Sequence, residues 1–152
     1  MASLLDPIEI GEIYLPNRVI MAPLTRLRGT PDHIPTQIMA EYYAQRAGAG
    51  LIISEGIPVV PQGVGYANVP GIWSRDQIEA WKVVTKAVHH AGGRIFAQLW
   101  HVGRISDPRF LDGKLPVAPS AIRPAGHVSL VRPASDYVTP RALETTELPS
   151  IV

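Results

Sequence analysis

Residues 19–26 have the sequence Val19-Ile20-Met21-Ala22-Pro23-Leu24-Thr25-Arg26, in which an apolar run ends abruptly at a proline and a threonine. A short apolar run closed by a turn signal is typical of a strand that is covered on both faces. In parallel α/β folds, functional groups gather just beyond the carboxyl ends of the strands. The stretch therefore predicts a buried strand that leads into a functional loop.

Two later stretches end in the same way. The apolar run at residues 51–53 is followed by Ser54-Glu55-Gly56, and the run at residues 94–97 is followed by Gln98-Leu99-Trp100-His101. Because parallel strands end at one edge of a sheet, we expect these polar and aromatic clusters to lie close together.

Two helices are expected between these strands. Residues 35–47 carry Pro35 in the first helical turn and are followed by glycines that end the helix. A second helix begins at Ser74, where Gln77 completes a capping box, and ends at Gly92-Gly93. The order β-α-β-α-β predicts right-handed crossovers and a parallel sheet, and thus an α/β fold.

The flanking segments have weaker patterns. Residues 8–19 alternate and contain turn residues, which predicts a short hairpin that plugs or caps the sheet. Residues 102–142 are rich in proline, with strand-like pieces at 128–131 and 136–138 that predict a hairpin within a long loop. Residues 146–152 have the pattern of the first turn of another helix.

Composition excludes several classes of protein. The chain has 152 residues, 46% of them hydrophobic, and a net charge of +1, which fits one ordinary globular domain. Its 14 basic and 13 acidic residues are interspersed, so no nucleic-acid partner is expected. No apolar run approaches the roughly 20 residues of a membrane span, no signal peptide is visible, and there is no cysteine. A cytoplasmic location is therefore expected, with no membrane partner.

Three parallel strands leave two open sheet edges and a core that cannot close. A barrel of eight β/α units takes about 250 residues. We therefore expect residues 1–152 to be the N-terminal part of a single (β/α)8 TIM-barrel domain, made of about three β/α units with an N-terminal hairpin and a loop hairpin. The alternative is a small, complete three-stranded α/β domain.

Several catalytic patterns are missing from the sequence. Residues 63–68 lack the adjacent strand, the helix and the third glycine of a dinucleotide-binding loop, and Ser54 lacks the flanking glycines of a nucleophile elbow. The five histidines form no helical pair of the kind that binds zinc, so no metal site is expected.

Gln98 and Trp100 lie two residues apart and therefore point to the same side of their strand. An amide both donates and accepts hydrogen bonds, which suits the edge of a heterocycle, and an indole supplies a flat apolar wall. The alternative is a buried core amide beside a packing tryptophan. Two further alternatives stay open: Thr25 binds a ligand oxygen or caps its loop, and Tyr66 lines a pocket or lies on the surface.

Four motifs closely resemble the old yellow enzyme family in order and spacing. They are Met21-Ala-Pro-Leu-Thr-Arg26, Ser54-Glu-Gly56, the segment 62–73 and Ala97-Gln-Leu-Trp-His-Val-Gly-Arg104. The resemblance covers nearly all 152 residues and implies the first two fifths of an FMN-dependent (β/α)8 barrel. The family's other subgroup has cysteine where this chain has Thr25, so the chain resembles the classical bacterial ene-reductases.

By this resemblance, specific residues would contact the flavin. The loop Ala22-Pro23-Leu24-Thr25 would pass along the isoalloxazine ring, with the Thr25 hydroxyl near carbonyl O4, where it tunes the reduced ring. Gly56 would let the backbone approach the ring edge, and Gln98 would hydrogen-bond the pyrimidine N3 and O2. Tyr66 and Trp100 would line the substrate pocket above the ring.

The resemblance also implies an activity. A complete barrel would use NADPH or NADH to reduce bound FMN and then reduce an activated alkene, such as an enone, nitroalkene or maleimide, or a nitrate ester. The partner implied is the complementary C-terminal part of the barrel. The alternative is a non-catalytic barrel fragment that docks with a complementary chain. A barrel hydrolase is disfavoured, because Glu55 is the only carboxylate at a predicted strand end.

Overall fold

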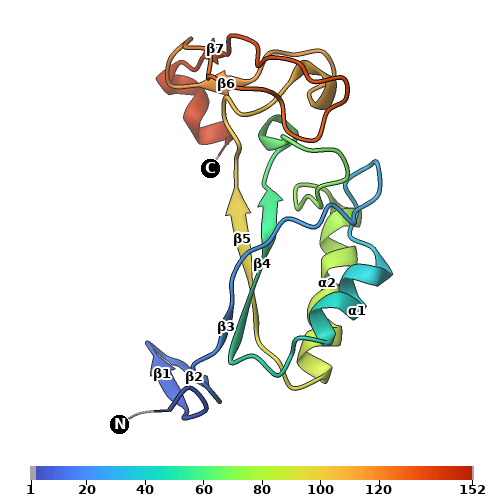
Figure 1. Cartoon of the computed structure of the whole chain (residues 1–152), viewed down its shortest axis with the longest axis vertical. Coiled ribbons are helices and arrows are strands. Elements are labelled where there is room, and N and C mark those ends of the chain that lie inside the picture. Colours follow the sequence, from blue (N-terminus) through green and yellow to red (C-terminus); the bar gives the residue numbers. More distant parts are fainter. Residues whose placement is uncertain (1–2, 152) are drawn as a thin grey trace.

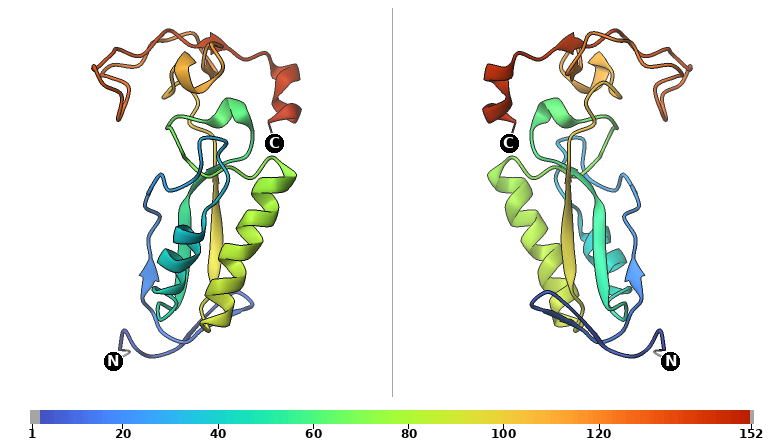
Figure 2. Two further views of the ribbon diagram at one scale, coloured as in Figure 1. Left: turned by 90° about the vertical axis from the view of Figure 1, so that its right-hand side faces the viewer. Right: turned by 90° about the vertical axis from the view of Figure 1, so that its left-hand side faces the viewer.

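The computed structural model describes residues 3–151 and has a three-stranded parallel sheet at its centre (Figure 1). The strands are β3 (Ile20–Met21), β4 (Leu51–Pro58) and β5 (Ile95–Trp100), in the spatial order β3-β4-β5. The helices α1 (Gln37–Ala44) and α2 (Arg75–His90) both cover the same face of this sheet (Figures 1 and 2). The expected β-α-β-α-β order is confirmed.

The core lies between the sheet and the two helices. It is a cluster of buried apolar side chains from α1, β4 and α2, namely Met39, Ala40, Tyr43, Ile52, Ile57, Trp81, Val84 and Val88. These α2 residues follow helical spacing along one face, so the helix buries a single stripe against the sheet. Within residues 3–151, no helix lies on the opposite face of the sheet (Figure 2).

Helix α2 begins as its sequence predicts. The Ser74 side chain accepts a hydrogen bond from the Gln77 backbone N–H, and the Gln77 side chain accepts one from the Ser74 backbone N–H. His89 and His90 lie in the last turn, where the helix dipole favours positive charge. Within residues 3–151, no helix is long and apolar enough to cross a membrane.

Helix α1 is shorter than the expected span of 35–47. Its regular part ends at Ala44, because the next N–H groups bond to carbonyls only three residues back, Arg46 to Tyr43 and Ala47 to Ala44. Such bonds tighten the last turn and stop the α-helical ladder.

Strand β4 contains a bulge close to its carboxyl end. Ile53 pairs with Phe96, but the next pair along the ladder is Gly56 with Gln98, so β4 uses three steps where β5 uses two. One extra residue reverses the alternation of side chains between the two faces of a strand. Glu55 therefore points toward α1, and Gly56 lies on the face that carries no helix.

A hairpin lies at the amino-terminal end of the sheet (Figure 1). It consists of β1 (Ile8–Ile10) and β2 (Ile13–Leu15), paired antiparallel, with Gly11 in the left-handed conformation that its turn requires. The expected hairpin within residues 8–19 is confirmed.

The loops beyond the carboxyl ends of β4 and β5 form the other end of the molecule (Figures 1 and 2). They contain three 3-10 helices, Pro61–Gly63, Pro108–Phe110 and Thr145–Ser150, and a parallel strand pair, β6 (Val117–Ala118) and β7 (Arg141–Ala142). Arg109 joins two of these loops, because its guanidinium pairs with the buried Asp107 carboxylate at 2.6 Å and also bonds the Ser135 hydroxyl.

Two loop segments differ from their expected form. The loop hairpin is a single antiparallel bridge between His127 and Asp136 rather than two strands, because Leu130 adopts a left-handed conformation and Pro133 cannot donate to a ladder. The expected helix start at 146–152 is the 3-10 helix Thr145–Ser150, which holds a proline without an N–H. Val152 lies outside the described residues.

Replacing the N-cap of α2 should weaken the fold by a small, defined amount. We expect Ser74→Ala to lower the free energy of unfolding by about 1 kcal/mol, because the Gln77 N–H loses its acceptor. The measurement is urea unfolding of the complete barrel that contains this chain. Thr85→Ala, which removes a hydroxyl from the middle of the same helix, serves as the control, and an equal loss in both variants would contradict the capping role.

Candidate functional site

The three parallel strands end at the carboxyl-terminal edge of the sheet, and the candidate site lies at this edge and in the loops that follow it (Figure 1). Thr25 follows β3 and is half-buried, Gly56 is buried within β4, and Gln98 is half-buried within β5. Gly56 and Gln98 are direct partners in the β4–β5 ladder. The expected convergence of the strand ends is therefore present in the structure.

The Glu55 carboxylate ties the loop after Thr25 to the end of β4. Its Oε2 atom accepts hydrogen bonds from the backbone N–H groups of Arg26 at 3.1 Å and Leu27 at 3.2 Å. Only 1% of Glu55 is exposed, so these bonds are shielded from water. The loop that begins at Thr25 is thereby held next to Gly56.

Tyr43 of α1 completes the environment of this carboxylate. Its hydroxyl donates to Oε1 of Glu55 at 3.3 Å and accepts from the Glu55 backbone N–H at 2.9 Å. Burial raises the pKa of the Glu55 carboxyl above its ordinary value, and its hydrogen bonds oppose that rise. Burial also raises the pKa of the Tyr43 hydroxyl well above its ordinary range, so this hydroxyl keeps its proton.

The Ser54 hydroxyl stabilises the bulge by linking β4 to β5. This buried hydroxyl donates to the Glu55 carbonyl at 2.8 Å and accepts from the Gln98 backbone N–H at 3.0 Å. The side-chain amide of Gln98 has no hydrogen-bond partner within residues 3–151. Its donors and acceptor are thus available to a ligand.

Trp100 and Tyr66 form an aromatic wall beside Gly56. The two rings stack with centroids 6.2 Å apart and an angle of 25° between their planes. A Cβ atom on Gly56 would lie 2.3 Å from the Trp100 ring, so only glycine allows this contact. Tyr66 is half-buried and packs against the Trp100 ring.

The loop residues Ala22, Pro23 and Leu24 are exposed, with 54% of Leu24 accessible. Together with Thr25, they directly follow β3, the strand at one edge of the sheet. The structure thus brings Thr25, Gly56, Gln98, Trp100 and Tyr66 to one edge, and leaves residues 22–24 as an open rim next to them.

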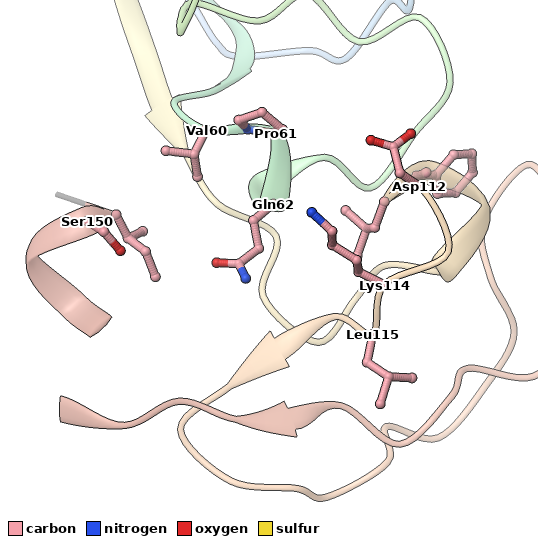
Figure 3. A pocket seen from close by; sticks show the side chains of 10 residues that line it. Val60, Pro61, Gln62, Asp112, Lys114, Leu115 and Ser150 are labelled. Carbon is pink, nitrogen blue, oxygen red and sulfur yellow. The ribbon is translucent and has the colours of Figure 1, made fainter. Parts of the chain in front are cut away.

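A separate cavity of about 300 Å³ lies among the loops (Figure 3). Its lining combines residues 60–62, residues 110–115 and the 3-10 helix near Ser150, and its polar groups include those of Gln62, Asp112 and Lys114. None of the site residues above lines this cavity, so the two features are distinct.

Sequence reasoning placed Ser54 and Glu55 in the cluster at the end of their strand but gave neither a role, and it did not connect Tyr43 with the site. A polar pair between apolar residues of one strand does not by itself indicate a bulge. The bulge becomes visible only from the pairing of β4 with β5. Tyr43 was assigned only to a helix, and its sequence gives no sign that its hydroxyl reaches the strand end.

Parallel β/α units, with polar and aromatic groups near the carboxyl ends of their strands, define this chain as part of a (β/α)8 barrel. The sequence profile of the NADH:flavin oxidoreductase / NADH oxidase family matches residues 3–149. The chain belongs to this family. The expected resemblance to old yellow enzymes is confirmed by the comparisons below.

Two curated relatives illustrate the similarity. Flavin oxidoreductase hxnT of Emericella nidulans is 44% identical over 157 residues, which cover 100% of this chain and 40% of the relative. The 12-oxophytodienoate reductase 7 of Oryza sativa subsp. japonica is 40% identical over 99% of this chain and 39% of its own length. The chain thus spans about two fifths of the length of these relatives.

Solved structures agree with this assignment. An old yellow enzyme homologue from Zymomonas mobilis superposes with a TM-score of 0.93 and 52% identity, over 98% of this chain and 42% of the solved chain. Morphinone reductase in complex with tetrahydroNAD superposes with a TM-score of 0.91 and 49% identity, over 99% of this chain and 43% of the solved chain.

The contact between Gly56 and Trp100 leads to a specific prediction. Gly56→Ala should displace the Trp100 ring, because the added methyl group overlaps it. We expect the indole N–H resonance of Trp100 to shift in NMR spectra, while those of Trp73 and Trp81 stay in place. Gly48→Ala is the control, because a Cβ there meets nothing within 4 Å, and an unmoved Trp100 signal in Gly56→Ala would contradict the packing.

Proposed function

We propose that this chain is the N-terminal part of a barrel that binds FMN and uses NADPH or NADH to reduce activated alkenes such as enones, nitroalkenes and maleimides, as well as nitrate esters. The observation that carries the proposal is the meeting of Thr25, Gly56 and Gln98 at one sheet edge, beside an aromatic wall. Membership of a family described as NADH:flavin oxidoreductases supports it.

The residues present fit a flavin ring. Gln98 offers an unpartnered amide, Gly56 offers backbone without a side chain, and Trp100 with Tyr66 offers a flat apolar surface. When bound, FMN would supply the uptake and delivery of hydride, which no side chain of this chain can provide.

Each residue would then have a defined task. The Gln98 amide would donate and accept along the pyrimidine edge, with the Gly56 backbone close to the ring. The Thr25 hydroxyl, which has no hydrogen-bond partner within residues 3–151, would donate to the carbonyl O4 and stabilise negative charge there. Ala22, Pro23 and Leu24 would pass along the ring, and Tyr66 and Trp100 would limit the size and orientation of the alkene.

A complementary part of the barrel is required for this activity. Phosphate sites of such barrels commonly lie at the loops after strands seven and eight, beyond the three strands described here. Apolar side chains of the edge strand β5 are also exposed to solvent, namely 46% of Phe96 and 61% of Leu99. We propose that further β/α units cover these groups and hold the FMN phosphate, and the cytoplasmic location stays a prediction.

The test is a visible absorption spectrum of the purified complete barrel, before and after anaerobic addition of NADPH or NADH. We expect flavin bands that bleach on reduction and return when an enone is added. A colourless complete barrel with intact folding would contradict FMN binding, and a flavin that no alkene reoxidises would contradict the substrate class.

Removing the Thr25 hydroxyl should alter the flavin reaction. We expect Thr25→Ala to slow flavin reduction by about tenfold, because a hydrogen bond to a charged group contributes about 1.5 kcal/mol. Stopped-flow absorbance of the complete barrel measures the rate. Thr25→Ser keeps the hydroxyl and should retain most of the rate, and equal rates in Thr25→Ala and the parent protein would contradict the tuning role.

A second candidate function is favoured by the open sheet edges. The chain would be a non-catalytic barrel fragment that docks with a complementary chain through Ile20, Phe96 and Leu99, which are exposed. Size-exclusion chromatography of the chain with its complement separates the two functions. A colourless stable complex supports docking alone, and a compact, stable monomer of this chain contradicts docking.

A further inference from the structure

Glu55 is a buried carboxylate that forms no ion pair with a side chain of residues 3–151, although the positive charge of Arg26 lies near enough to favour its ionised form. No ion pair of Glu55 occurs among the residues that the structure describes, and only neutral groups bond it: the N–H groups of Arg26 and Leu27 and the hydroxyl of Tyr43. Burying a carboxylate in this way costs free energy compared with an apolar side chain of similar size. Its presence therefore requires a reason other than fold stability.

The bonds of Glu55 fix a loop whose own sequence does not favour its shape. Leu27 has a φ of 56°, a left-handed conformation that costs a non-glycine residue about 1 kcal/mol or more. The N–H groups of two successive peptides, Thr25–Arg26 and Arg26–Leu27, both donate to the same carboxylate oxygen. The carboxylate thus holds the turn that directly follows Thr25.

The bulge in β4 connects this turn to Gln98. It directs Glu55 toward α1 and the turn, and the Ser54 hydroxyl beside it accepts from the Gln98 backbone N–H at 3.0 Å. Two adjacent residues therefore locate the backbones that carry Thr25 and Gln98. The side chains of Thr25 and Gln98 both have hydrogen-bonding groups without a partner within residues 3–151.

We propose that Glu55, supported by the Tyr43 hydroxyl, is a positioning residue that holds the Thr25 hydroxyl at its flavin contact. This role rests on the proposed function, and it assigns to Glu55 no contact with the flavin or the substrate. Glu55 acts through the backbone of residues 26 and 27, so its effect on the flavin depends on the presence of Thr25.

A double-mutant cycle on the FMN-loaded complete barrel tests this dependence, with the flavin midpoint potential as the readout. We expect Glu55→Ala and Tyr43→Phe to shift the potential in the same direction as Thr25→Ala. In the Thr25→Ala background, Glu55→Ala should add no further shift. Glu55→Gln keeps an acceptor oxygen for both N–H groups and should restore most of the parent potential.

Asp107→Ala is the matched control, because Asp107 is also a buried carboxylate but bonds Arg109 in a loop away from Thr25. It should lower stability without moving the potential. If Glu55→Ala does not fold, Tyr43→Phe, which removes a single hydroxyl, takes its place in the cycle. Equal shifts from Asp107→Ala, or additive shifts from Glu55→Ala and Thr25→Ala, would overturn the positioning role.

Hydrogen exchange provides a readout that needs no flavin. The Arg26 and Leu27 amides should be protected in the parent barrel and should exchange faster in Glu55→Ala, whereas the Gly29 amide, bonded to the Asn68 carbonyl at 3.0 Å, should stay protected. If the parent barrel contains no flavin, the proposed function is contradicted, and with it the positioning role, even when the Arg26 and Leu27 amides are protected. A parent barrel with flavin but unprotected Arg26 and Leu27 amides defeats the positioning role alone.

Discussion

The bulge at Ser54 and Glu55 is the constraint on which the rest of the site depends. Without the extra residue in β4, Glu55 would point to the face that carries no helix, and Ile57 would leave the core that it shares with Tyr43. The bulge places a carboxylate against α1 and leaves bare backbone at Gly56 on the opposite face. One local irregularity thus serves both the core and the site.

The two faces of the sheet differ in how their side chains are packed and hydrogen-bonded. The face toward α1 and α2 buries a continuous apolar cluster, and the Trp81 indole N–H within it donates to the Gly71 carbonyl at 3.0 Å, so the packing leaves this donor satisfied. The other face carries Gln98 and Trp100, whose amide and indole N–H groups have no partner within residues 3–151. The polar groups of one face are hydrogen-bonded within the fold, and those of the other face lack partners. The second face is therefore suited to binding a flat, polar ligand.

Patterns that depend on neighbouring residues in the chain could be predicted from the sequence. The capping box of Ser74 and Gln77, the turn at Gly11 and the alternation that puts Gln98 and Trp100 on one side all depend on local spacing, and all are present. The bulge and the bonds of Glu55 could not be predicted, because they depend on which strand lies beside β4 and where α1 crosses it. The sequence did not predict where α1 ends or that the loop hairpin is reduced to one bridge. The first depends on backbone hydrogen bonds to carbonyls three residues back and the second on the left-handed conformation of Leu130, and neither leaves a trace in the spacing of apolar residues.

The pairing of β6 with β7 brings the chain back to where it left. Ala118 and Ala142 are neighbours in a parallel ladder, so the whole segment between the two strands starts and ends at adjoining points. Closing a loop costs only about 0.6 kcal/mol more each time its length doubles. Insertions and deletions in this segment are therefore expected to disturb the three-stranded sheet little, so its length can vary more freely than that of the β/α units.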